Sequence, residues 1–462
     1  MNRVWLWAPY AWIEHAWQEG VLLEVGSDGR FARISHGLSC PPDAHRLAGP
    51  VLPAMVNAHS HAFQRGFAGL TEQRHAQQDD FWSWRERMYE LALRITPDQV
   101  RVIATQLYAE LLAGGYTQVC EFHYLHHAPD GTPYAQPAAM CEALAQAASD
   151  VGIGLTLLPV LYQRSGFGQT TLTTRQRRFA GTPQSVLALR DASRRLGYRH
   201  LTAGVAIHSL RAVAPQSIAH LITLLGDDPA PVHIHIAEQT AEVQDCLTHT
   251  GLRPIRWLAE HVRLDHRWQL VHATHADAAD VQSIAGTGAG IVVCPSTEAN
   301  LGDGLFDWRA WRSADVPTAI GSDSHVSRQW PGELRLLEYG QRLHLRQRNI
   351  AAHSYRGMAS SGNALFASSL TAGATASGHS VWGLREGARA DLLVLDTHAS
   401  GLLGVPAPDL IDALIFACDA PAFDEVWVAG ERRVAAGRHL AQAQISVPFS
   451  VLMQSLTAQA AS

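Results

Sequence analysis

Two histidines with one residue between them, His59 and His61 in the stretch NAHSHAFQRG (57–66), could bind one metal ion together. They follow an apolar run, GPVLPAMV, that is typical of a buried strand. Side chains at positions i and i+2 of a strand point to the same face, so both imidazoles could reach one ion. The chain holds 25 histidines, however, and a pair with this spacing also arises by chance. The pair alone leaves a metal site and an incidental spacing as open alternatives.

Three further side chains that can bind metals stand at the ends of apolar segments later in the chain. They are His235 in HIHIAE, His272 in LVHATH and Asp323 in IGSDSH. If these segments meet in the fold, three imidazoles and one carboxylate suit a divalent ion that keeps a water molecule. If they do not meet, each histidine is a buried residue with a hydrogen-bond partner and the aspartate caps a turn. The fold must decide between these readings.

Short apolar segments that end in polar residues recur along the chain, with helical segments between them. Near-continuous apolar strands are buried on both faces, which predicts a parallel sheet covered by helices. Eight such units predict an α/β fold of the (β/α)8 type, a TIM barrel, whose strand ends converge on one mouth. The segments are 51–61, 117–124, 153–162, 202–209, 231–238, 268–275, 288–297 and 317–325.

A doubly wound open sheet is the alternative, because it also alternates strands and helices. The glycine-rich stretch GTGAG (286–290) precedes a predicted strand instead of following one. It therefore lacks the arrangement of a dinucleotide-binding loop. We expect the barrel.

The two ends of the chain predict a second, smaller domain. Residues 22–35 predict a hairpin around a Ser-Asp-Gly turn, and 390–396 and 425–437 predict further short strands. We expect a small flanking β-sandwich domain built from both chain termini, beside the barrel. The predicted parts are 1–50 for its N-terminal half, 51–375 for the metal-dependent barrel, and 376–462 for its C-terminal half and a terminal helix.

The composition excludes several classes of protein. A chain of 462 residues that is 47% hydrophobic can bury a large core, and its net charge of -6 gives no basic field for nucleic acid. All 36 basic residues are arginine, which excludes Schiff-base chemistry, a lysine-dependent phosphate loop and a metal pair bridged by a modified lysine. The six cysteines are scattered without paired spacing, so we expect buried free thiols.

The N-terminal stretch MNRVWLWAPYAWIEHAW mixes charged and aromatic residues too early to be a signal peptide. No apolar run reaches the length that is needed to cross a bilayer. We expect a cytoplasmic protein with no membrane or nucleic-acid partner.

The motifs at the strand ends carry a family resemblance that covers essentially the whole chain. HSH after the first strand, HIHIAE, LVH and GSDSH resemble the amidohydrolase superfamily, specifically its mononuclear deaminase branch. The absence of lysine agrees, because binuclear relatives usually need a carboxylated lysine on the fourth strand. NAHSHAFQRGFAGLTEQR and DDFWSWRERMY are similar to the deiminases that hydrolyse N-formimino-L-glutamate to N-formyl-L-glutamate and ammonia in histidine degradation.

The resemblance implies a hydrolase with one divalent metal ion, zinc first, bound by His59, His61, His235 and Asp323. A Lewis-acidic ion lowers the pKa of a bound water toward neutrality, and Asp323 can accept its first proton. Glu238, three residues after His235, is implied as the group that carries protons to the leaving nitrogen. His272 is implied as a hydrogen-bonding or acid/base partner, although a ligand role stays open. The same ligands also accept Fe(II) or Mn(II).

A glutamate derivative brings two carboxylates that the site must neutralise. Phe81, Trp84, Arg85 and Met88 fall at helical spacing, an apolar stripe that contains one arginine. Either this is a core helix whose arginine reaches water, or Arg85 faces an anion in the pocket.

Arg211 in AIHSLRAV is the second candidate for binding a substrate carboxylate. The resemblance supports it as a substrate contact, together with Arg85 and with His208, Gln64 and Tyr124. A structural glutamine and a packed tyrosine are the alternatives for Gln64 and Tyr124.

Other functions of the same barrel remain as alternatives. Guanine, adenosine-type and triazine deaminases share its ligands, and Trp82 and Trp84 could stack on a substrate ring. A barrel that binds metal without turnover is a further alternative. The resemblance also implies a homodimer that acts on a small dicarboxylate.

Overall fold

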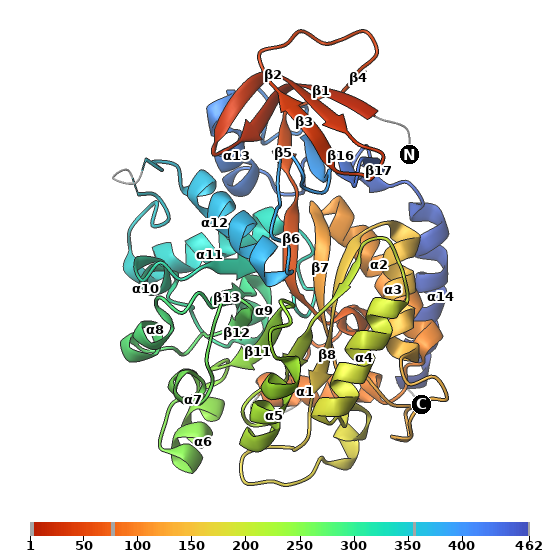
Figure 1. The fold of residues 1–462 in the computed structure, drawn as a ribbon, viewed down its shortest axis with the longest axis vertical. Coiled ribbons are helices and arrows are strands. Elements are labelled where there is room, and N and C mark those ends of the chain that lie inside the picture. The colour runs from red at the N-terminus through yellow and green to blue at the C-terminus, as the bar shows by residue number, and fades with distance from the viewer. Residues whose placement is uncertain (1–3, 75–78, 354–356, 461–462) are drawn as a thin grey trace.

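The computed structural model describes residues 4–74, 79–353 and 357–460, which form a parallel barrel and a separate sheet (Figure 1). The barrel confirms the predicted fold class. Its strands pair in the order β14-β13-β12-β11-β10-β8-β7-β6, and β9 (Leu201–Ala203) pairs with β8 beside β10. Their bounds are β6 (Met55–Ser60), β7 (Tyr116–His123), β8 (Gly154–Leu161), β10 (Val205–Ile207), β11 (Val232–Ile236), β12 (Trp268–His272), β13 (Gly290–Val293) and β14 (Thr318–Ile320).

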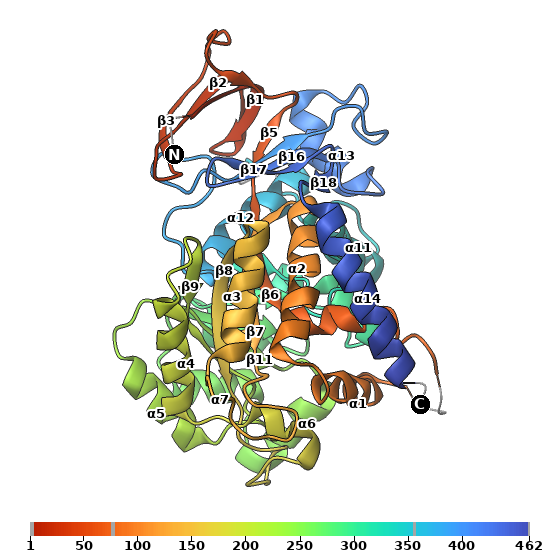
Figure 2. The same cartoon turned by 90° about the vertical axis from the view of Figure 1, so that its right-hand side faces the viewer.

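The barrel strands are buried along their length, as the apolar segments predict. Every residue of β7 and β8 is buried, which requires cover on both faces of the sheet. Helices supply the outer cover (Figures 1 and 2). They are α2 (Pro97–Ala113), α3 (Ala139–Val151), α4 (Pro183–Arg195), α5 (Pro215–Leu225), α6 (Thr240–Thr250), α7 (Pro254–His261), α8 (Ala278–Ile284), α9 (Pro295–Leu301), α10 (Trp308–Ser313), α11 (Trp330–Leu345) and α12 (Ser361–Ala376).

The barrel closes between its first and last strands, over a very short stretch of backbone. Ser60 and Asp323 form an isolated parallel bridge. The amides of Ser322 and Asp323 donate to the carbonyl oxygen of His59, at 3.1 and 3.0 Å. The amide of His61 donates in turn to the carbonyl oxygen of Asp323, at 3.3 Å. Closure therefore occurs at the candidate ligands themselves.

The terminal segments build one continuous sheet in the order β18-β17-β16-β15-β5-β1-β2-β3, with β4 paired to β1. Strands β5 and β15 are antiparallel neighbours, so the two ends of the chain meet there. This confirms a separate sheet made from both termini. The last helices, α13 (Leu410–Phe416) and α14 (Gln442–Ala460), pack against helices of the barrel, α13 against α11 and α12 and α14 against α2 (Figure 2). The strands are β1 (Val4–Ile13), β2 (Ala16–Val25), β3 (Phe31–Ser35), β4 (His45–Arg46), β5 (Val51–Pro53), β15 (Leu392–Leu395), β16 (Phe423–Val428), β17 (Glu431–Ala435) and β18 (Arg438–His439).

The single strand expected over 51–61 is two strands in two sheets. Val51–Pro53 pairs with the terminal sheet, and Met55–Ser60 starts the barrel. Pro53 has no N–H to donate, so it can end a ladder but cannot continue one. The chain passes from one sheet to the other at Ala54.

A buried ion pair fixes the terminal sheet to the barrel. Arg389 donates to Asp391 at 2.6 Å, to the side-chain oxygen of Gln118 at 2.9 Å and to the carbonyl oxygen of Thr117 at 3.0 Å. Thr117 and Gln118 lie at the start of β7. The terminal sheet therefore contacts the end of the barrel opposite the strand tips, and Figures 1 and 2 show it at the far end of the molecule from α1 (Phe81–Ala92).

The structure bears on the cysteines and on membrane-spanning helices. The six cysteines are free, as their spacing predicts, and five of them are buried as expected, whereas Cys40 is only partly buried. Within the described part of the chain, no helix is both long and apolar enough to span a membrane.

Gly321 lies where the barrel closes and leaves no room for a side chain. A Cβ atom at this position would lie 2.7 Å from the Cβ of His59 and 3.0 Å from the Sγ of Cys294. Gly321→Ala should therefore lower the free energy of unfolding by about 1–3 kcal/mol, measured by chemical denaturation, because overpacking forces the closing strands apart. Gly166→Ala is the matched control, since no atom lies within 4 Å of its added Cβ. Equal stability of the two variants would contradict a tight closure.

Candidate metal centre and active site

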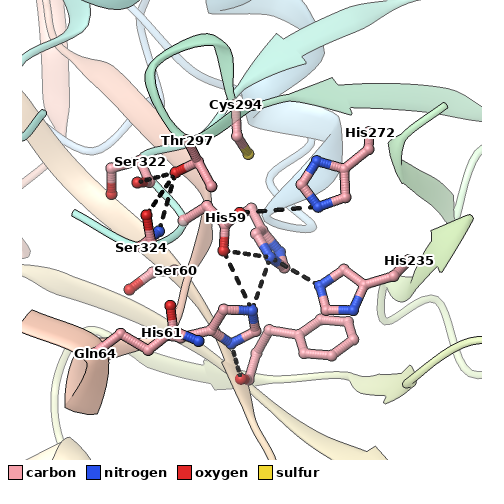
Figure 3. Close-up of polar contacts among 12 residues, drawn as sticks. His59, Ser60, His61, Gln64, His235, His272, Cys294, Thr297, Ser322 and Ser324 are labelled. Carbon is pink, nitrogen blue, oxygen red and sulfur yellow. Dashed lines mark hydrogen bonds and ion pairs between the residues drawn. The ribbon is translucent and has the colours of Figure 1, made fainter. Parts of the chain in front are cut away.

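Three imidazole nitrogens and one carboxylate converge at the tips of the barrel strands (Figure 3). Nε2 of His59 lies 3.1 Å from Nε2 of His61 and 3.0 Å from Nε2 of His235. Oδ1 of Asp323 lies 3.5 Å from Nε2 of His59 and 3.4 Å from Nε2 of His61. A tetrahedral zinc ion with Zn–N bonds of about 2.0–2.1 Å places its ligand atoms roughly 3.3 Å apart. These four separations fit that spacing; His59, His61 and Asp323 form one group with donor atoms within 4.8 Å of one another, and His59 and His235 belong to a second.

The protonation of these groups also suits a cation. Nδ1 of His61 donates to the carbonyl oxygen of Phe122 at 2.8 Å, so its Nε2 presents a lone pair to the centre. Burial, and then the charge of His59, lower the pKa of His61 to about 3. Burial also lowers the pKa of His59 and holds that of His235 well below its usual value. Although burial alone would raise it, the pKa of Asp323 is held low by His59 and His61. Neutral imidazoles and an ionised carboxylate are the forms that bind metal.

The backbone is strained where two of the strands end. His272 has φ of 72° and Asp323 has φ of 45°, both in the left-handed region that non-glycine residues rarely adopt. Such a conformation costs roughly 1–2 kcal/mol for a residue with a side chain. The closing hydrogen bonds to His59 and from His61 hold Asp323 in it. Strain of this kind commonly marks a functional site.

His272 faces carboxylates on both sides of its ring. Its Nε2 lies 3.8 Å from Oδ2 of Asp323 and 4.0 Å from Oε1 of Glu238, and its Nδ1 lies 3.2 Å from Oε1 of Glu298. Burial would lower the pKa of His272, but Glu238, Glu298 and Asp323 raise it to about 10. A ring nitrogen of His272 also lies within 4.8 Å of ligand atoms of His59 and His235, so the geometry leaves its ligand role open.

Glu238 is buried beside His272, in the turn that follows β11. The amides of Ala237 and Glu238 donate to the carboxylate of Glu242 at 3.3 and 3.1 Å, which fixes this turn. Burial raises the pKa of Glu238, against the opposing charge of His272. A carboxyl group with a raised pKa can both accept and donate a proton near neutrality.

One pocket of about 510 Å³, counted out to its open mouth, joins the candidate ligands to the predicted substrate contacts. His59 lies beneath it, in contact with the other ligands. Seven apolar or aromatic side chains complete the wall, and the stripe Phe81, Trp84 and Met88 is among them. The predicted residues that line it are His61, Gln64, Arg85, Tyr124, His208, Arg211, His235, Glu238, His272 and Asp323.

The two arginines of the pocket have no acidic partner. Among the described residues, no carboxylate lies within ion-pair distance of Arg85 or Arg211, and the buried Nε of Arg85 makes no hydrogen bond. Nearby, the side-chain amide of Gln64 donates to the hydroxyl of Tyr124 at 3.0 Å. Burial, and then the charge of Arg211, keep the pKa of His208 well below its usual value, so its ring is neutral. Arg85 and Arg211 therefore line the pocket without a direct ion pair, although the charges of Glu242 and Glu238 act on Arg211 from a longer distance.

The sequence analysis missed three residues that support the site. The ring of Phe122 stacks on His235 at 4.2 Å. The carboxylate of Glu121 accepts from the hydroxyl of Ser60 at 2.7 Å and from the amide of Ala62 at 2.6 Å, one on each side of His61. Glu298 accepts from His272. Phe122 and Glu121 lie in the predicted second strand and Glu298 follows the seventh, so their place in EFHY and PSTE was the only signal.

Comparison with known proteins gives consistent matches along the chain. A model of the amidohydrolase family matches residues 51–433. Over 445 residues, 96% of this chain and 97% of the relative, the chain is 45% identical to a formimidoylglutamate deiminase of Pseudomonas aeruginosa. The crystal structure of an amidohydrolase from Brucella melitensis has a TM-score of 0.93 and 41% identity, and covers 98% of this chain and 100% of its own. Atrazine chlorohydrolase from Arthrobacter aurescens TC1, complexed with zinc, has a TM-score of 0.82 at 18% identity over 97% of this chain and 100% of its own, which shows the fold alone.

Proposed function

Because this chain belongs to the amidohydrolase family, we propose that it is a metal-dependent deiminase that converts N-formimino-L-glutamate and water to N-formyl-L-glutamate and ammonia. The reaction hydrolyses a C–N bond of a linear amidine and fits a step of histidine degradation. The observation that carries the proposal is the pocket, in which a candidate metal centre faces two arginines without carboxylate partners. A small dicarboxylate with a formimino group at one end has matching chemistry at both ends.

We assign the metal to His59, His61, His235 and Asp323, and propose zinc. The support is the spacing of their donor atoms, the inward lone pair of His61 and the depressed pKa values of the imidazoles. When bound there, the ion supplies Lewis acidity that makes a water molecule nucleophilic near neutral pH.

The reaction requires that both protons of the attacking water reach the leaving nitrogen. The water oxygen forms a bond to the formimino carbon, the C=N electron pair moves to nitrogen, and the C–N bond then breaks to release ammonia. Asp323 takes the first proton from water at Oδ2, the oxygen that faces His272. Glu238, on the other side of His272, passes protons to the nitrogen that leaves.

His272 acts between these two carboxylates. As an imidazolium held by Glu298, it stabilises negative charge that develops on the attacking oxygen. Its contact with Glu298 supports this role, because a ring held in the protonated form by a carboxylate has no lone pair to offer to a metal.

The substrate carboxylates bind on the opposite wall, at Arg85 and Arg211. A guanidinium presents paired N–H donors that match a carboxylate. Gln64, Tyr124 and the neutral ring of His208 supply hydrogen bonds to the polar atoms between the two ends. A purine or triazine has no anion for these arginines. Of the two tryptophans considered for stacking on a ring, Trp84 lines the pocket, whereas Trp82 does not and has guanidinium groups over its ring.

The resemblance also implies a homodimer and a cytoplasmic location. We propose both the homodimer and the cytoplasmic location on the family resemblance alone.

The substrate assignment predicts a selective release of ammonia. N-formimino-L-glutamate should give the highest kcat/KM in a panel with guanine, adenosine, an amino-triazine and unsubstituted formamidine, because only it offers two carboxylates. Metal analysis of the same sample should find about one divalent ion per chain. A higher kcat/KM with a ring substrate would contradict the proposal, and loaded protein that is inert to the whole panel would favour a non-catalytic barrel.

The arginine wall predicts a binding defect. Arg85→Ala and Arg211→Ala should each raise KM for N-formimino-L-glutamate by about 10- to 100-fold, the value of a lost hydrogen bond to a charged group. Bound metal should be unchanged, since neither residue touches the ligands. Arg101→Ala is the control, because this exposed arginine pairs with Asp150 on α2 and α3. Unchanged kinetics in both pocket variants would remove the carboxylate role.

The role of Glu238 predicts a loss of turnover without loss of metal. Glu238→Gln keeps the shape but cannot carry a proton, so kcat should fall by about 10²- to 10⁴-fold. Metal content and the unfolding midpoint should match wild type. Glu86→Gln, on the exposed surface of α1, should keep full activity. Near wild-type turnover in Glu238→Gln would mean that protons travel by another route.

A further inference from the structure

Both unpaired arginines of the pocket lie against one indole ring. The guanidinium carbon of Arg85 lies 4.5 Å from the ring centre of Trp82, and that of Arg211 lies 5.5 Å from the same centre. Both distances are within the range of cation–π attraction. Trp82 is therefore a common partner of two side chains that come from different parts of the barrel.

The two arginines belong to separate elements that share no backbone pairing. Arg85 is in α1, one helical turn after Trp82, and Arg211 is in the segment between β10 and α5. Tyr89, also on α1, lies 5.5 Å from Arg85. Although burial alone would lower the pKa of Arg211, the hydroxyls of Tyr162 and Tyr89 are close enough to raise it. Trp82 is the ring over which both guanidinium groups lie.

Two like charges in a pocket repel each other, and no carboxylate of the described chain forms an ion pair with either guanidinium. From their distances to the ring centre, the two guanidinium carbons cannot be more than about 10 Å apart. The negative face of an indole offsets the repulsion and holds each guanidinium group at a preferred position over the ring. Without it, both long side chains would be free to move away from each other toward water.

We propose that Trp82 is a positioning residue that sets the spacing of the Arg85 and Arg211 guanidiniums and so selects a dicarboxylate of glutamate length. This inference rests on the proposed function, in which those arginines bind the two substrate carboxylates. Trp82 acts through the arginines and does not line the pocket itself. It therefore affects which dicarboxylate binds, and leaves the reacting groups at Glu238 and Asp323 unchanged.

The test measures binding of two products that differ by one methylene, N-formyl-L-glutamate and N-formyl-L-aspartate, to the metal-loaded enzyme by calorimetry. Wild type should bind the glutamate compound more tightly. Trp82→Leu should weaken that binding by about tenfold and remove most of the preference between the two lengths. Trp82→Phe, which keeps an aromatic face, should stay within about threefold of wild type. In kinetics, Trp82→Leu should raise KM and leave kcat within about threefold.

The control is Tyr339→Leu, which removes an exposed aromatic ring that lies 5.4 Å from Arg342 on α11, far from the pocket. It should change neither affinity nor length preference. If Trp82→Leu does not fold, Trp82→Met provides a second non-aromatic variant for the same measurement. Unchanged affinity and preference in a folded non-aromatic variant would overturn the role of Trp82. If wild type binds neither product, the proposed function fails, and this inference fails with it.

Discussion

The site depends on a few hydrogen bonds that close the barrel. The amides of Ser322 and Asp323 donate to His59, and the amide of His61 donates to Asp323, so the first and last strands meet at the ligands. These bonds hold Asp323 in a left-handed conformation, with its carboxylate beside the imidazoles of His59 and His61. Residues more than 260 positions apart in the sequence thereby share one small space, as the Asn57–Ser322 pair beside them also shows.

Acidic and basic side chains occupy different parts of the pocket. At the barrel tips, buried carboxylates surround His272 and raise its pKa, while the ligand imidazoles are kept neutral by burial. Elsewhere in the pocket lining, Arg85 and Arg211 form no ion pair with a carboxylate of the described chain. Each end is poorly balanced without a ligand, because buried charges are normally paired. A cation at one end and a dicarboxylate across the other would complete both.

The supporting residues act by fixing orientation. Phe122 holds His61 through its carbonyl oxygen and His235 through its ring. Glu121 accepts from the hydroxyl of Ser60 and from the amide of Ala62, one on each side of His61. Glu298 and Glu242 do the same for His272 and for the turn of Glu238. Groups of this kind set the direction of ligands and of proton carriers, and their loss commonly costs 10- to 100-fold in affinity or activity.

The amino-acid sequence determined the barrel and the residues at its mouth, because strand periodicity places polar side chains at the tips of apolar segments and parallel strands bring those tips together. His59, His61, His235, Glu238, His272 and Asp323 could be placed near one another on that ground, and the motif around Trp84 and Arg85 suggested a second wall. Only the tertiary structure decided that 51–61 divides between two sheets, that Phe122 offers its carbonyl to His61, and that Arg85 and Arg211 share the ring of Trp82. The reason is physical: periodicity fixes which face a side chain occupies, whereas carbonyl acceptors and contacts between distant elements depend on how those elements pack.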